Sequence, residues 1–263
     1  MQDAAPTEHR QSDALDPARA QALFATLGLA EQVQAGDALP PFFHQLYFWD
    51  ARPPAALGCD GHPRVGGLIP DMGLPRRMWA GGRLQFDHPV RLGTVAERRS
   101  VCETVREKTG RSGPLAFVTL RHEIWQDNRL CLTEWQDLVY RPEADPTAPP
   151  PAPPAAPGTD GDVVRFDATL LFRYSALTFN GHRIHYDETY ARDIEGYDGL
   201  VVHGPLLAQL LMLKAVRELG ALRRFSFRGA SPLMHDEAAT LCRDGTALWV
   251  AGQDGRLVRS AEV

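Results

Sequence analysis

The residue types best suited to chemistry gather in one polar segment, residues 174–205. The candidates in this segment are an amide, a carboxylate and three imidazoles, namely Asn180, Asp187, His182, His185 and His203. An imidazole titrates nearer to neutral pH than other side chains, so it can take up and return a proton, and an amide can hold a water molecule. The combination favours general acid–base catalysis with an activated water.

Two other interpretations of the segment fit less well. A metal site could use His182, His185 and Asp187, because their H-x-x-H-x-D spacing lets two ligands share one face of a short helix. The segment lacks, however, the helical H-E-x-x-H frame of zinc hydrolases. A nucleophilic triad needs an activated serine or cysteine, and the chain has no G-x-S-x-G motif.

A candidate backbone donor follows directly. Residues 204–219 carry apolar side chains around most of a predicted helix, which indicates that this helix is buried. Pro205 suits the first turn, because the amide hydrogen that it lacks would have no partner there. The N–H of Gly204 would then point out of the positive end of the helix, where it could stabilise a developing oxyanion. An acid–base group followed by such a donor fits chemistry on a thioester carbonyl.

These residues resemble the signature of hot-dog-fold (R)-specific enoyl-CoA hydratases and MaoC-like dehydratases. The sequence is most similar to the double-hot-dog branch, the type 2 hydroxyacyl-thioester dehydratases, which includes mesaconyl-C4-CoA and itaconyl-CoA hydratases. The resemblance rests on residues 172–180, 182–187 and 200–205, and in the N-terminal half on residues 46–48, 64–67, 75–83 and 110–115. It implies an α+β double hot-dog fold and reversible hydration of a 2-enoyl-thioester, with no metal and no redox cofactor.

The resemblance also implies the catalytic roles. His185 would deprotonate the water and return a proton to the substrate, Asn180 would hold that water, and the Gly204 N–H would bind the thioester oxygen. The wider hydratase pattern has an aspartate five residues before the histidine, where this chain has Asn180. Because an amide cannot act as a base at neutral pH, the proton transfer would fall to His185 alone. We interpret Asn180 as variation within the branch and not as loss of activity.

Further residues are candidates for substrate binding. Arginines can bind the phosphates of coenzyme A or a substrate carboxylate through a bidentate fork, although an arginine taken alone is more often a solvated charge or part of a structural ion pair. His182 is expected to form local hydrogen bonds and not to act as a second catalyst. The candidate substrate-binding residues are His182, Arg183, His203, Arg76, Arg83 and Arg228.

The chain is predicted to consist of two hot-dog halves, residues 13–141 and 159–263. Eight of its 21 prolines fall in residues 142–158, which therefore form a semi-rigid linker or, alternatively, a short ligand for a proline-binding domain. In the N-terminal half we expect a helix over 17–29, an irregular Gly- and Pro-rich stretch over 40–89, and antiparallel strands over 95–107, 114–126 and 129–140. In the C-terminal half we expect strands over 163–171, 223–228, 238–243, 247–252 and 256–261 around the helix over 204–219.

Each half should therefore form an antiparallel sheet. The C-terminal sheet would wrap around a buried central helix, and the N-terminal half would have a degenerate helix region. Residues 84–90 and 225–233 also echo one another, which favours a duplicated unit.

Composition limits the partners. The chain has 263 residues, 44% of them hydrophobic, so it can bury a large core. A formal net charge of -5 argues against nucleic acid or an anionic membrane surface as the main partner. Four scattered cysteines without a C-x-x-C pair form neither a zinc pattern nor a disulfide frame, which is typical of a cytoplasmic protein.

We therefore expect a carbon–oxygen lyase that acts on an acyl-CoA, with a short dicarboxylyl-CoA such as mesaconyl-C4-CoA or itaconyl-CoA as the substrate that the resemblance suggests. The chain could form a homodimer. Two alternatives stay open. One is a 3-hydroxyacyl-[acyl carrier protein] dehydratase with the same catalytic residues. The other is a non-catalytic acyl-CoA-binding protein, which Asn180 would suit.

Overall fold

The fold is organised by one continuous antiparallel sheet. The computed structural model describes residues 8–110, 113–143 and 152–263. The sheet has ten strands in the order β1-β3-β4-β5-β2-β7-β10-β9-β8-β6. The strands are β1 (Glu8–Asp13), β2 (Arg76–Phe86), β3 (Ala96–Gly110), β4 (Gly113–Gln126), β5 (Arg129–Arg141), β6 (Asp162–Arg165), β7 (Arg224–Gly229), β8 (Ala238–Asp244), β9 (Ala247–Gly252) and β10 (Leu257–Glu262).

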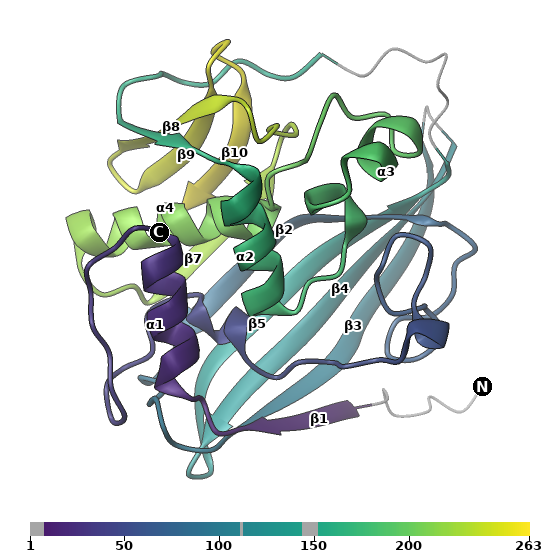
Figure 1. The fold of residues 1–263 in the computed structure, drawn as a ribbon. Coiled ribbons are helices and arrows are strands. Elements are labelled where there is room, and N and C mark those ends of the chain that lie inside the picture. Colours follow the sequence, from purple (N-terminus) through teal and green to yellow (C-terminus); the bar gives the residue numbers. More distant parts are fainter. Residues whose placement is uncertain (1–7, 111–112, 144–151) are drawn as a thin grey trace.

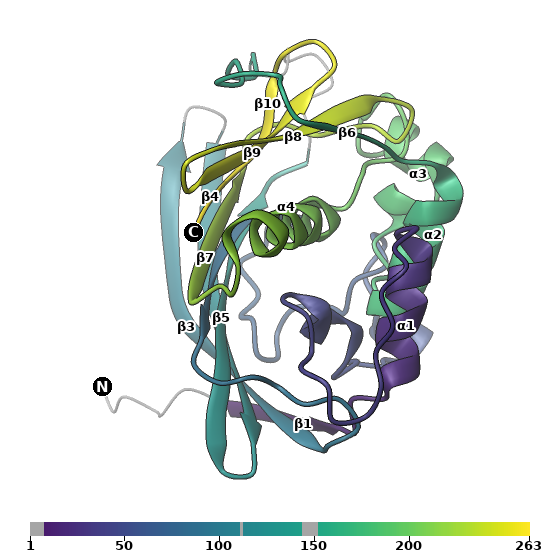
Figure 2. The same ribbon diagram turned by 90° about the vertical axis from the view of Figure 1, so that its left-hand side faces the viewer.

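The helices lie on one side of this sheet. They are α1 (Pro17–Thr26), α2 (Ala168–Thr178), α3 (Glu188–Asp193) and α4 (Gly204–Leu219), with short 3-10 turns η1 (Phe43–Leu46), η2 (Pro54–Ala56) and η3 (Arg183–His185). The C-terminal strands curve over α4, and α1 and α2 pack beside each other on the side of α4 away from the sheet (Figures 1 and 2). Leu206, Leu207 and Leu211 of α4 are buried in the main core, as their spacing predicts.

The two halves have the same strand order. The N-terminal half runs β1-β3-β4-β5-β2 from its outer edge inward, and the C-terminal half runs β6-β8-β9-β10-β7, with each strand in the corresponding position. This correspondence fits the predicted duplication. The double hot-dog prediction is confirmed, but the two sheets are not separate. Strands β2 and β7 pair antiparallel, with Arg83 opposite Ser226, because each would otherwise leave an unpaired edge.

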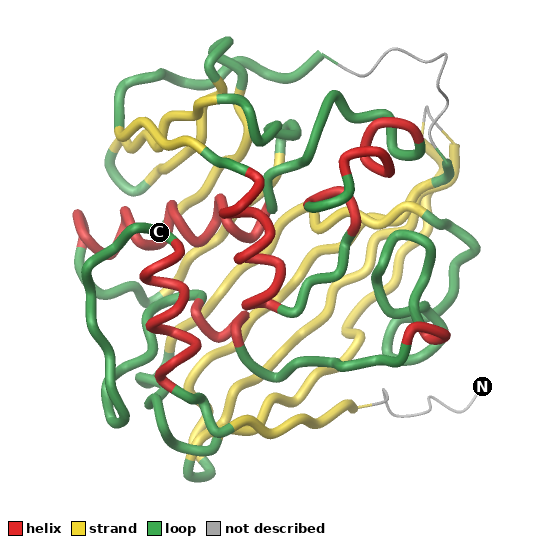
Figure 3. Tube along the Cα trace, viewed as in Figure 1, coloured by secondary structure: helices red, strands yellow, loops and turns green. Residues whose placement is uncertain are grey.

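The helix content of the halves differs as expected. Helix α4 has the predicted bounds, whereas the N-terminal segment between α1 and β2 contains only η1 and η2 (Figure 3). The predicted meander strands are present as β3, β4 and β5. The proposed linker, residues 142–158, lies partly outside the described residues, because 144–151 are not described. Its last part runs beside β10, where Ala155 bridges to Arg256.

Three elements differ from the sequence prediction. Strand β1 was not predicted, and the strand expected over 163–171 ends at Arg165 because Asp167 caps α2 by accepting a hydrogen bond from the Leu170 N–H. Strand β2 lies within the stretch predicted to be irregular. A side chain at Gly81 or Gly82 would come within 2.7 Å of a backbone oxygen on a neighbouring strand, so these glycines permit the close approach of strands at the join.

No helix within residues 8–110, 113–143 and 152–263 has the length and apolar character needed to cross a membrane.

The packing around α4 predicts which helix positions carry stability. Replacing Leu211, which is fully buried, by Ala should lower the free energy of unfolding by about 2–5 kcal/mol, because the core cannot collapse fully around the cavity. Urea denaturation followed by circular dichroism measures this change. Leu219→Ala at the exposed end of the same helix is the matched control and should change it by less than about 0.5 kcal/mol. Equal losses in both variants would contradict the central position of α4.

Candidate active site

His185 is held in the form that can accept a proton. It ends the short turn η3, and its side chain is only 6% exposed. Its Nδ1 donates a hydrogen bond to the Val201 carbonyl oxygen at 2.7 Å, since a carbonyl can only accept. Nε2 is then the unprotonated nitrogen, and it has no hydrogen-bond partner among the described residues. Burial lowers the pKa of His185 to about 4, so the ring is neutral at neutral pH.

A second imidazole supports the ring of His185. The rings of His185 and His203 stack with centroids 3.7 Å apart and planes at 20°. His203 is fully buried, and its Nε2 lies 2.8 Å from Ser175 Oγ on α2. Burial holds the pKa of His203 well below its ordinary value. His203 therefore contacts His185 and Ser175 and does not line an open surface. Its ring fixes the plane of the His185 ring.

The stack places His185 beside the start of α4. His203 is the N-cap residue of this helix, and Gly204 is its first residue. The first backbone N–H groups of a helix have no intrahelical partner and carry its positive partial charge. A side chain on Gly204 would come too close to Nη2 of Arg259, so the glycine lets the guanidinium approach the start of the helix closely. The structure therefore brings the predicted base and the predicted oxyanion donor together.

Asn180 lies just beyond the end of α2. Phe179 adopts a left-handed conformation with φ 52° that ends the helix, and the Asn180 N–H donates to the Ser175 carbonyl oxygen at 2.9 Å. Its side-chain Oδ1 accepts a hydrogen bond from the His182 N–H at 3.0 Å. The amide NH₂ and the second lone pair of Oδ1 remain available to hold a water.

His182 lies within a second polar cluster. Its ring centroid is 4.4 Å from that of His62 and 5.4 Å from that of His185. Oδ2 of Asp60 lies 3.0 Å from Nδ1 of His62, and one ligand atom from each of Asp60, His62 and His182 fits within 4.8 Å. This is a different set from the H-x-x-H-x-D pattern. Desolvation lowers the pKa of both His62 and His182, so both rings are neutral at neutral pH.

Asp187 does not share a site with His182 and His185. Its carboxylate caps α3 by accepting from the Tyr190 N–H at 3.0 Å, and it pairs with Arg183 at 2.7 Å. The backbone hydrogen bond and the Arg183 guanidinium hold the pKa of Asp187 below its ordinary value. The sequence pattern for a metal site is therefore explained by helix capping.

The predicted arginines are spread over the surface. Arg76 forms a half-buried ion pair with Glu195 at 2.6 Å, and Arg183 is paired with Asp187. Arg83 and Arg228 are exposed, and in their strands they alternate with inward-facing Leu84 and Phe227. Successive side chains of a strand point to opposite faces, so the structure does not bring Arg83 or Arg228 to His185.

Two residues near His203 were missed at the sequence level, Arg259 on β10 and Tyr174 on α2. Arg259 is 5% exposed although it is charged, and the Tyr174 ring lies 4.9 Å from the His203 ring. Arg259 pairs with Val250 and Ala261 pairs with Leu248 in continuous register, so the alternation of the strand turns the arginine to the same inner face as Ala261. Its spacing of two from the buried Ala261 is the only sequence signal that could have indicated this orientation.

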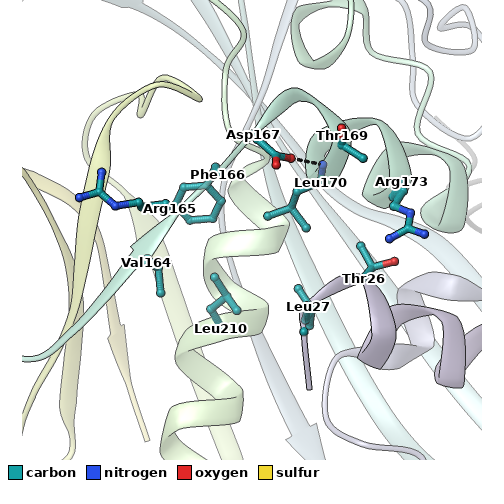
Figure 4. Close-up of a pocket in the computed structure, with 11 residues that line it drawn as sticks. Thr26, Leu27, Val164, Arg165, Phe166, Asp167, Thr169, Leu170, Arg173 and Leu210 are labelled. Carbon is teal, nitrogen blue, oxygen red and sulfur yellow. Dashed lines mark hydrogen bonds between the residues drawn. The ribbon is translucent and has the colours of Figure 1, made fainter. Parts of the chain in front are cut away.

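The pocket drawn in Figure 4 lies away from these residues. It has a volume of about 390 Å³ and is lined by the end of α1, the β6–α2 connection and Leu210 of α4. Neither His185 nor Gly204 lines it. We place the candidate site at His185 because the pocket lacks a base and an oxyanion donor in contact.

The chain matches known sequences over most of its length. Residues 42–235 match the family model described as hydroxyacyl-thioester dehydratase type 2. The chain is 45% identical over 254 residues to a mesaconyl-C(4)-CoA hydratase from Chloroflexus aurantiacus, covering 94% of this chain and 91% of that protein. It is 28% identical to a mitochondrial hydroxyacyl-thioester dehydratase type 2 from Schizosaccharomyces pombe, covering 81% of this chain and 80% of the relative.

Comparison with solved structures supports the fold. HtdX of Mycobacterium tuberculosis superposes with a TM-score of 0.67 at 19% identity, covering 97% of this chain and 98% of HtdX. Another protein from Mycobacterium tuberculosis, described as a double hotdog fold, superposes with a TM-score of 0.59 at 14% identity, covering 99% of this chain and 96% of that protein.

The buried, neutral His185 predicts a pH dependence of stability. Below pH 6.5 the unfolded chain takes up a proton on this histidine that the folded protein refuses until about pH 4, so stability is lost as the pH falls through this range. Between pH 6.5 and pH 4 the free energy of unfolding should fall by about 3 kcal/mol more for wild-type protein than for His185→Gln, because glutamine cannot take up the proton. Urea denaturation at each pH measures the difference. His88→Gln, at an exposed histidine, should behave as wild type. Parallel curves for wild type and His185→Gln would contradict the depressed pKa.

Proposed function

Because the chain belongs to the hydroxyacyl-thioester dehydratase type 2 family, we propose that it catalyses the reversible addition of water to a 2-enoyl-CoA to give a 3-hydroxyacyl-CoA. The observation that carries this proposal is the stacking of His185 on His203, the residue directly before Gly204. It sets one free imidazole nitrogen beside the positive end of a helix. Hydration of a conjugated thioester requires a base and an oxyanion donor that can reach the same substrate.

In the proposed reaction, Nε2 of His185 removes a proton from a water that Asn180 holds. The oxygen of this water bonds to the β-carbon, and the π electrons move toward the thioester carbonyl, whose oxygen becomes negative. The N–H of Gly204 stabilises that oxygen. The His185 imidazolium then returns the proton to the α-carbon, which completes the addition of H and OH. The reverse sequence removes water.

The electrostatics of the site make His185 a weak base that is free to accept a proton at neutral pH and gives it up readily. A neutral His185 is ready to accept a proton at neutral pH, and its buried surroundings disfavour the imidazolium. The proton is therefore held weakly and is returned readily to the enolate. The carbonyl of Val201 keeps the proton of the neutral ring on Nδ1, so that Nε2 faces the water.

His185, Asn180 and the Gly204 N–H together supply the groups that the proposed reaction uses. Addition of water needs no external oxidant or reductant, so we propose that no redox cofactor and no metal takes part. The Chloroflexus aurantiacus relative suggests a dicarboxylyl thioester such as mesaconyl-C4-CoA as the substrate, with itaconyl-CoA as a second candidate. A cytoplasmic location and a homodimer stay predictions.

Removing the base tests the mechanism. His185→Ala should lower the rate of hydration by about 10²–10⁴-fold or more, because no other group takes the proton from water. The loss of enoyl-thioester absorbance in purified protein measures the rate, with mesaconyl-C4-CoA as substrate. His88→Ala is the matched control at an exposed histidine and should keep wild-type activity.

Two results would contradict the proposal. Turnover retained by His185→Ala would remove this histidine from the mechanism. Tight binding of enoyl-CoAs by wild-type protein with no turnover on any of them would favour the non-catalytic alternative.

The thioester carrier is a separate question. We expect kcat/KM for the CoA thioester to exceed that for the same acyl group on acyl carrier protein by at least about tenfold, since the relative with 45% identity is named for a CoA substrate. Steady-state rates on the two thioesters of one enoyl group measure this ratio. A ratio below one would instead assign a carrier-protein dehydratase.

A further inference from the structure

Arg259 is a buried cation without an anionic partner. Its side chain is 5% exposed, and its Nε and Nη1 atoms are buried without a hydrogen bond. It forms no ion pair within the described part of the chain. Its guanidinium carbon lies 5.3 Å from the centre of the Phe227 ring. Burial lowers its pKa to about 10, so it is still charged at neutral pH. Burying a charge is costly unless it is paired.

The location of this cation makes a purely structural role hard to explain. Nη2 of Arg259 lies against Gly204, at the positive end of the 16-residue helix α4. A cation at this end of a helix is repelled by the helix dipole. An anion bound beside both the guanidinium and the helix N-terminus would offset both costs, because it attracts each of them.

Two further buried polar atoms without partners among the described residues belong to residues next to Gly204 in the chain or in contact with its neighbour His203. The Tyr174 hydroxyl and Nδ1 of His203 are buried without hydrogen bonds. The rings of Tyr174 and His203 are in contact, and His203 precedes Gly204. Burial raises the pKa of Tyr174, so its hydroxyl stays protonated and can donate. Arg259 and Tyr174 thus supply a charged fork and a hydroxyl donor, which is the donor set that a carboxylate accepts.

We propose that Arg259, assisted by the Tyr174 hydroxyl, binds a carboxylate of the acyl group and so selects short dicarboxylyl thioesters. This inference rests on the proposed function and names the specificity residue of the same site. In mesaconyl-C4-CoA the carboxylate is attached to the β-carbon, so it lies only a few bonds from the thioester oxygen. With that oxygen at the Gly204 N–H, the carboxylate is close to the guanidinium that contacts Gly204. An acyl chain without a carboxylate leaves the buried charge unpaired, which is a strong basis for rejection.

Binding of saturated thioesters tests the inference without turnover. Succinyl-CoA and butyryl-CoA differ in that a carboxylate replaces a methyl group, and neither can be hydrated. Calorimetry should show that wild-type protein binds succinyl-CoA more tightly than butyryl-CoA. Arg259→Met should weaken succinyl-CoA binding on the order of 100-fold and leave butyryl-CoA binding unchanged. Tyr174→Phe, which removes one hydroxyl, should give a smaller loss in the same direction. Arg224→Met, at an exposed arginine on β7, is the matched control.

A kinetic comparison adds a second readout. Arg259→Met should lower kcat/KM for mesaconyl-C4-CoA on the order of 100-fold and leave that for its neutral analogue 3-methylcrotonyl-CoA within a few fold. The inference would be overturned if Arg259→Met and Tyr174→Phe each weakened binding of the ligand without a carboxylate as much as binding of the ligand that carries one. It would also be overturned if Arg259→Met kept the wild-type preference for succinyl-CoA. If wild-type protein prefers succinyl-CoA through Arg259 but hydrates no enoyl-CoA, the carboxylate subsite stands and the hydratase proposal fails.

Discussion

The contact on which the site depends is the stack of His185 on His203. It joins two segments that approach the site from different directions, the loop after α2 and the N-terminus of α4. The hydrogen bond from His185 to Val201 fixes the tautomer, and the bond between His203 and Ser175 anchors the stack to α2. Because both rings are buried, their orientation is set by packing and not by solvent, which is the preorganisation that a general base requires.

The duplicated fold accounts for a single site of this kind. Both halves contribute the same strand order to the sheet, but only the C-terminal half has a long helix against it. The N-terminal half instead fills the corresponding space with η1 and loop. An oxyanion donor of the Gly204 type needs the open end of a long helix, so the half without such a helix can support the sheet but cannot repeat the chemistry.

Several features could be predicted from local sequence. The apolar residues around most of α4 reflect burial on most sides of the helix, and the alternation in β4 and β5 reflects the two faces of a sheet, so a local pattern records both directly. Strand β2 could not be predicted in this way, because Gly81 and Gly82 are glycines for a tertiary reason, the close approach of neighbouring strands at the β2–β7 join. The strand expected over 163–171 is present only as far as Arg165, because a single cap, Asp167, starts a helix where the apolar run suggested that the strand continues.

The residue types alone were enough to favour the proposed chemistry, because an imidazole, an amide and a glycine at a helix start fall within one segment and suit hydration. The tertiary structure alone decided which side chains face that chemistry. It turned Arg83 and Arg228 to the outer face of the sheet and turned Arg259 inward beside Gly204. A polar strand residue can face either side, and the face is assigned by the register with the neighbouring strands, here Arg259 opposite Val250, and not by the type of the residue itself.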